Sequence, residues 1–97
     1  HDDLTQDELV YPHLVRATDI DMGRHMNNVV YIRLLLDCFS AKELASGMIR
    51  TIEAHYASPC LEGETLGVFC RREEGRCRMA VKHADGRPAV LAQVIFG

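Results

Sequence analysis

The chain has 97 residues, of which 47% are hydrophobic and 26% charged, and its formal net charge is −3. This composition is typical of one folded domain and excludes a disordered tail. The longest unbroken apolar runs, Val29–Ile32 and Ala89–Ala92, are too short to span a bilayer. Residues 1–8 lack the apolar stretch of a secretory signal, and the acidic balance argues against a nucleic-acid partner.

The chain begins with a polar, acidic stretch, residues 1–12, which we expect to be a lead-in or linker. A single domain is expected over residues 13–97. A first strand is predicted over Pro12–Thr18, and the polar loop Asp19–Asn27 follows it.

A long helix is predicted over Asn28–Ala45, capped by the asparagine that opens or precedes it and ended at Ser46-Gly47. Its first three turns are apolar except for a narrow stripe that contains Arg33 and Asp37. A helix that is apolar almost all round is a buried one. Arg33 and Asp37 are expected to pair along the exposed stripe.

After the helix the hydrophobic pattern changes to a period of two, which predicts strands. They are Ile49–Ser58, Thr65–Arg72, Arg76–Ala84 and Pro88–Phe96. Consecutive hairpins make an antiparallel sheet, and Asp85-Gly86 is typical of a tight hairpin turn. The sheet has to wrap around the helix to bury it. We therefore predict an α+β hotdog fold, a curled antiparallel sheet of about five strands around one long central helix.

The four cysteines are Cys38, Cys60, Cys70 and Cys77, and no two of them form a Cys-x-x-Cys pair. Most of them lie in apolar helical or strand-like runs, which favours reduced, buried cysteines in a cytoplasmic protein over a disulfide framework. A zinc site is disfavoured as well, because no histidine or cysteine pair has ligand spacing. We expect no metal.

The segment before the helix carries Asp19, Asp21, His25, Asn27 and Asn28. The helix start supplies unpaired backbone N–H groups that can hold a carbonyl oxygen or an oxyanion. A nearby carboxylate can act as general base on water or attack directly, and an imidazole can shuttle a proton. These groups suit acyl transfer to water. The alternative is a capping loop, because Asp and Asn are the usual cap and turn residues.

The stretch Arg16–Ile32 resembles the segment that opens the C-terminal hotdog domain of acyl-acyl-carrier-protein (acyl-ACP) thioesterases. That family has the pattern Ser/Thr-Asp-x-Asp-x-Asn-x-His-x-Asn-Asn-x-x-Tyr-Ile. The resemblance implies hydrolysis of a fatty acyl thioester of acyl carrier protein or CoA, without a metal or cofactor. It makes Asp21 the catalytic aspartate and His25 the catalytic histidine, with Asn27 as a further catalytic candidate. The positions expected to contact substrate are Gly23, Asn28 and Val29.

Two positions depart from the family pattern. Gly23 stands where the family has a catalytic Asn, and Pro59 stands where it has a carboxylate. Cys60 matches a cysteine once proposed as the family's nucleophile, but Pro59-Cys60-Leu61 offers no base or helix end that would lower the thiol pKa. We expect Cys60 to pack, and His83 to be a half-buried surface histidine. The departures leave an alternative function, a non-catalytic hotdog domain that binds an acyl chain or assembles with a catalytic one.

The last predicted strand is apolar on both faces over Ala89–Phe96, so neither face suits water. Proteins normally cover an open edge strand, and a domain this small has a thin margin of stability. We therefore expect pairing, either as a homodimer or with a second hotdog domain. The acyl pocket is expected between the two units.

Overall fold

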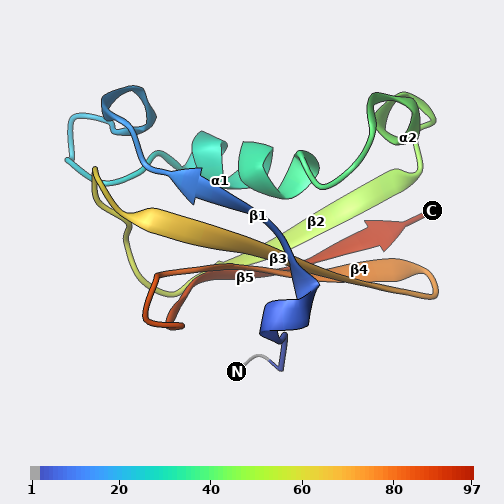
Figure 1. Ribbon diagram of the computed structural model, residues 1–97. Coiled ribbons are helices and arrows are strands. Elements are labelled where there is room, and N and C mark those ends of the chain that lie inside the picture. Colours follow the sequence, from blue (N-terminus) through green and yellow to red (C-terminus); the bar gives the residue numbers. More distant parts are fainter. Residues whose placement is uncertain (1–2) are drawn as a thin grey trace.

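The computed structural model describes residues 3–97 and confirms the predicted architecture (Figure 1). A five-stranded antiparallel sheet with the strand order β1-β3-β4-β5-β2 curls around helix α1, which spans Asn28–Leu36. The strands are β1 Leu9–Leu14, β2 Ile49–Tyr56, β3 Thr65–Glu73, β4 Arg76–Lys82 and β5 Pro88–Phe96. Among residues 3–97, no helix is long and apolar enough to cross a membrane.

The predicted long helix is wrong, because the structure has two helices in its place. After α1 the chain turns, and a short helix, α2, covers Ala41–Ala45. Ser40 caps α2 with a capping box: its Oγ accepts from the Glu43 amide at 3.1 Å and its own amide donates to the Glu43 carboxylate at 2.9 Å. A serine with these bonds favours a new helix start over the interior of a longer helix.

Helix α1 has one buried side and one exposed side, and is not buried all round. Val29 is 74% exposed, whereas Leu34 and Leu35 pack in the main core with sheet residues such as Val68 and Val90. Arg33 lies 3.4 Å from Asp19, so its ion pair is with the preceding loop and not with Asp37 as expected.

The last strand is not an edge of the sheet. β5 pairs with β4 on one side and with β2 on the other, so the open edges belong to β1 and β2. Its apolar character on both faces is that of a central strand, because both faces are covered: Val90 and Val94 pack in the main core, and Leu91 packs against a small cluster that contains Phe69 and Ala80.

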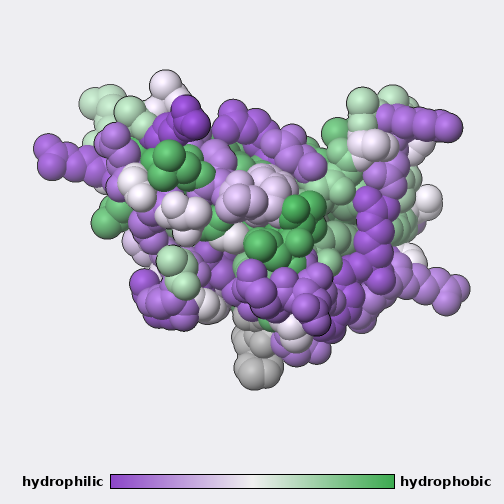
Figure 2. Space-filling model, viewed as in Figure 1, coloured by the Kyte–Doolittle hydropathy of each residue, from purple (hydrophilic) through white to green (hydrophobic). Residues whose placement is uncertain are grey.

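The first residues that the structure describes are bonded to the sheet. β1 begins at Leu9, ahead of the predicted Pro12, and follows a 3-10 helix, η1, at Gln6–Glu8. Arg71 on β3 holds this segment by donating to Glu8 at 2.6 Å and to Asp3 at 3.0 Å. Figure 2 shows hydrophilic residues over much of the face that carries β1, interrupted by separate hydrophobic patches.

The cysteines differ from the expectation of four reduced thiols. Cys70 on β3 and Cys77 on β4 are joined by a disulfide, whereas Cys38 and Cys60 are free. The antiparallel register places Cys70 opposite Met79, so that Cys77 is its diagonal neighbour across the two strands. Diagonal side chains on one face lie close enough to interact. The sequence spacing alone did not reveal this proximity.

Candidate functional site

One end of the sheet gathers the start of α1, the loop before it, the connection between β2 and β3, and the turn between β4 and β5 (Figure 1). A cavity of about 270 Å³ opens at this end, which we call the helix-start cavity. It is lined by His25, Met26, Asn28, Tyr31, Tyr56, Ala57, Ser58 and Pro59. The cavity therefore brings together the start of α1 and the end of β2, which lie far apart in the sequence.

Backbone hydrogen bonds hold the loop before α1 against this end of the sheet. The Met26 amide donates to the Cys60 carbonyl at 2.9 Å, and the Asn27 amide donates to the Asp19 carbonyl at 2.9 Å. Met26 is buried and anchors the loop in the core. These contacts fix where α1 begins and where His25 lies.

Of the two asparagines predicted as alternative caps, Asn27 is the one that caps the helix. Its side-chain oxygen accepts from the Val29 amide at 2.8 Å, and its carbonyl accepts from Val30 at 2.9 Å. The Asn28 amide has no such partner among residues 3–97. A free N–H at the positive end of a helix is suited to a carbonyl oxygen or an anion, and Asn28 lines the helix-start cavity.

Asp19, the first carboxylate of the motif, is a structural anchor. It is only 6% exposed, and it accepts from the Arg16 amide at 3.1 Å and pairs with His13 Nε2 at 2.7 Å. Burial opposes ionisation of the carboxyl, but the hydrogen bonds from Arg16 and His13 outweigh it and lower the pKa of Asp19. Asp19 therefore ties the loop to β1.

Asp21 has a different environment, since it is exposed on the loop. Its Oδ1 accepts from the Gly23 amide at 2.8 Å. A Cβ added at Gly23 would lie 3.2 Å from that same oxygen, so a side chain there would press on the carboxylate. Neither Asp21 nor Gly23 is among the residues that line the helix-start cavity. The structure thus brings His25 and Asn28 together on the cavity but leaves Asp21 turned toward its own loop.

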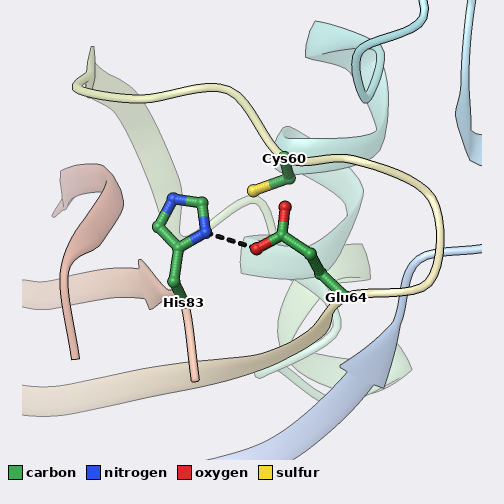
Figure 3. Close-up of side chains that lie close together, drawn as sticks. All are labelled: Cys60, Glu64 and His83. Carbon is green, nitrogen blue, oxygen red and sulfur yellow. Dashed lines mark hydrogen bonds and ion pairs between the residues drawn. The ribbon is translucent and has the colours of Figure 1, made fainter. Parts of the chain in front are cut away.

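A second polar cluster, of which Figure 3 shows His83 and Glu64, was not expected from the sequence. His83 is buried, with 6% exposure, against the expectation of a half-buried surface histidine. Its Nδ1 lies 2.6 Å from Glu64 Oε1, and its Nε2 lies 2.7 Å from Ser58 Oγ. Burial opposes ionisation of Glu64, but the hydrogen bonds from His83 and the Leu61 amide lower its pKa.

Cys60 lies next to this cluster, and its thiol does not have the properties of a nucleophile. The residue is 0% exposed, and its amide donates to the Tyr31 hydroxyl at 3.1 Å. Burial raises the pKa of the thiol, more than the hydrogen bond with Tyr31 lowers it. Reactive cysteines instead have lowered pKa values and accessible sulfur atoms.

Cys60, Glu64 and His83 also qualify as potential metal ligands, because their ligand atoms all lie within 4.8 Å of one another. Their present arrangement is that of a hydrogen-bonded cluster. The 2.6 Å between His83 Nδ1 and Glu64 Oε1 is a hydrogen-bond distance, whereas two ligands at ~2.0–2.2 Å from one tetrahedral zinc ion lie farther apart than that. An ion would require this bond to open and the buried thiol to lose its proton.

Sequence reasoning missed Ser58, Glu64 and His83 as a group. Ser58 and His83 are separated by 25 positions, and His83 and Glu64 by 19, so no local spacing connects them. The signals were weak: His83 continues the series of buried alternate positions Cys77, Met79 and Val81 just beyond the end of β4, and Glu64 follows the turn glycine Gly63.

The fold has close likenesses among solved structures. An acyl-ACP thioesterase from Bacteroides thetaiotaomicron matches with a TM-score of 0.87 at 27% identity, covering 98% of this chain and 40% of that one. The 12:0-ACP thioesterase from Umbellularia californica matches with a TM-score of 0.80 at 18% identity, covering 100% of this chain and 38% of that one. A hypothetical protein from Staphylococcus aureus in complex with CoA shares the fold at 17% identity and a TM-score of 0.77, covering 90% and 72% of the two chains.

The chain thus spans about 40% of the length of the two acyl-ACP thioesterases. Comparison with curated protein sequences finds no match. The family model for the acyl-ACP thioesterase C-terminal domain matches residues 3–95, which is nearly all of the chain. The chain therefore belongs to the acyl-ACP thioesterase C-terminal domain family.

Proposed function

We propose that the chain acts in the hydrolysis of fatty acyl thioesters, carried by acyl carrier protein or CoA, to a free fatty acid and a thiol. The observation that supports this most directly is the helix-start cavity, which is lined both by Asn28 at the start of α1 and by the exposed His25. A helix N-terminus beside a titratable side chain suits a carbonyl that gains negative charge during attack by water.

In the proposed mechanism the thioester carbonyl oxygen binds at the start of α1. The Asn28 amide donates to it, and His25 hydrogen-bonds the same oxygen or the leaving sulfur. Asn27 keeps the helix start in place through its bond to Val29. Asp21 holds and activates the attacking water after it exchanges its bond with the Gly23 amide for that water. No metal or cofactor takes part in these steps.

Substrate contacts follow from the same geometry. Asn28 lines the helix-start cavity, which supports it as a substrate contact. Val29 is exposed beside Asn28 at the start of α1 and offers an apolar surface to the acyl chain. Gly23 lies outside the cavity lining, and its proposed contact rests on its position next to Asp21 in the motif.

We also propose that the acyl pocket is completed by a second hotdog unit, either another copy of this chain or a second domain. The open strand edges of the sheet support this, because within residues 3–97 β1 and β2 each pair on one side only. The edge of β2 ends at Tyr56, which lines the helix-start cavity. A unit that pairs with β2 would therefore lie beside the cavity.

The alternative function is a non-catalytic domain that binds an acyl chain or assembles with a catalytic hotdog. It is favoured by the turn of the Asp21 carboxylate toward Gly23, away from the cavity, and by Pro59, which supplies no base at the cavity wall. Under this alternative the chain binds acyl thioesters but does not hydrolyse them.

The deciding experiment measures thiol release from acyl-CoA and acyl-ACP substrates of several chain lengths. Wild-type chain and Asp21→Asn are compared with Asp37→Asn, the same chemical change at an exposed position at the other end of α1. Turnover that is lost in Asp21→Asn and kept in Asp37→Asn supports the enzymatic function. If the wild-type chain binds acyl thioesters but hydrolyses none of them faster than Asp21→Asn does, the non-catalytic alternative is supported.

A further inference from the structure

We propose that Ser58, His83 and Glu64 form a proton relay that makes Ser58 the first acceptor of the acyl group at the helix-start cavity. The inference deepens the proposed thioesterase function and rests on it. It replaces direct attack by water with two steps, transfer of the acyl group to Ser58 and hydrolysis of the resulting ester.

The hydrogen bonds of His83 have the order that such a relay needs. One ring nitrogen, Nδ1, is 2.6 Å from the Glu64 carboxylate, and the other, Nε2, is 2.7 Å from the Ser58 hydroxyl. A carboxylate at Nδ1 fixes the tautomer with its proton there, which leaves the lone pair of Nε2 facing the hydroxyl. The ring is buried, so little water competes for either bond.

The backbone fixes both ends of the relay. The Glu64 carboxylate also accepts from the Leu61 amide at 2.6 Å, which orients it toward His83. Ser58 is held just after β2 by a hydrogen bond from its backbone amide to the Ala89 carbonyl at 3.3 Å. The Ser58 hydroxyl donates to the Pro88 carbonyl at 2.9 Å, so its single proton has to turn to Nε2 before the serine attacks.

The cavity places the relay next to the acyl site. Ser58 lines the helix-start cavity together with His25 and Asn28, whereas His83 and Glu64 are not among its lining residues. A thioester whose carbonyl oxygen binds the Asn28 amide would therefore lie in the same cavity as the Ser58 hydroxyl. A nucleophile, a base, an orienting carboxylate and an oxyanion donor are the parts that acyl transfer requires.

The reaction has an acyl-transfer step and a hydrolysis step. The Ser58 oxygen adds to the carbonyl carbon while its proton passes to His83 Nε2. The carbon–sulfur bond breaks, and the same proton passes to the departing sulfur. Water, held by Asp21, then adds to the ester and gives a proton to the Asp21 carboxylate. The bond from carbon to Ser58 breaks, that proton passes through water to the serine oxygen, and the fatty acid leaves.

The principal test uses Asp21→Asn, because this variant slows the second step and leaves the first intact. Incubated with acyl-CoA and examined by intact-mass and peptide mass spectrometry, it is expected to accumulate an acyl ester on Ser58. The double variant Asp21→Asn with Ser58→Ala is expected to carry no adduct. Ser46→Ala in the Asp21→Asn background is the matched control, since Ser46 is exposed and bonds only near α2.

A second readout does not depend on thioester turnover. An alkyl fluorophosphonate probe is expected to label Ser58 in the wild-type chain, at least tenfold faster than Ser40 or Ser46, and labelling is expected to be lost in His83→Gln. Glu64→Gln keeps the size of the side chain and tests the relay even if the His83 variant fails to fold. It is expected to slow labelling. Circular dichroism checks that each variant is folded.

The outcomes separate this inference from the proposed function. Hydrolysis at the wild-type rate in Ser58→Ala, without an adduct in any variant, overturns the relay and leaves the thioesterase standing. Probe labelling of Ser58 without hydrolysis of any thioester supports the relay and overturns the proposed function. Labelling abolished by a chelator overturns the relay, since Cys60, Glu64 and His83 would then act as metal ligands.

Discussion

Replacing Asp21 with Asn separates the chemistry of the carboxylate from its structural role. Asn keeps the side-chain oxygen that accepts from the Gly23 amide at 2.8 Å, so the loop retains its turn. Because the side chain is exposed, we expect the free energy of unfolding to change by no more than about 0.5 kcal/mol. Loss of a general base costs about 100- to 10,000-fold in rate, which is about 2.7–5.4 kcal/mol in the activation barrier.

The assay is thiol release under saturating acyl-CoA and acyl-ACP, with thermal unfolding measured on the same preparations. Asp37→Asn carries the identical change at the C-cap of α1 and is expected to match the wild type in both rate and melting temperature. If Asp21→Asn retains most of the wild-type rate, the carboxylate neither holds nor activates the water, and the proposed role of Asp21 is refuted. If it unfolds at much lower temperature, the loss of rate is structural.

For His25→Ala we expect a smaller loss of turnover, on the order of a hundredfold, as for one lost polar stabiliser of the transition state; an unchanged rate per folded molecule with lower thermal stability would make His25 structural. Asp19→Asn should destabilise the fold by about 1.5–3 kcal/mol at neutral pH. Because the hydrogen bonds of Asp19 lower its pKa despite burial, its contribution is present above the unfolded pKa and lost as pH falls through the folded pKa. Asp19→Asn should therefore show a weaker decline of stability in acid, measured by denaturant unfolding between pH 6 and pH 2. Leu35→Ala, in the core, should cost about 2–5 kcal/mol of unfolding free energy, with a loss well below that range contradicting tight packing of α1 on the sheet. Sedimentation at micromolar concentration should show a paired species or a mixed species with a second hotdog domain; a stable monomer that hydrolyses acyl thioesters would contradict the shared pocket.

The sequence by itself determined much of the local structure, with the exception of the break between α1 and α2. Alternating residues predicted the strands after the helix, and turn pairs such as Asp85-Gly86 predicted hairpins, because both signals act between residues that are close along the chain. The asparagine cap and the motif from Asp19 to Asn28 placed the candidate site at a helix start. The antiparallel sheet around a helix followed from the need to bury the apolar sides of both.

The tertiary structure alone decided which residues meet. β5 lies inside the sheet because β2 pairs with its second side. This pairing joins two strands that are separated in the sequence by β3 and β4. Ser58, Glu64 and His83 come together only when the end of β2, the start of β3 and the end of β4 reach the same end of the sheet. Such contacts are set by strand order and register, which depend on the packing of the whole chain and leave no periodic signal in the sequence.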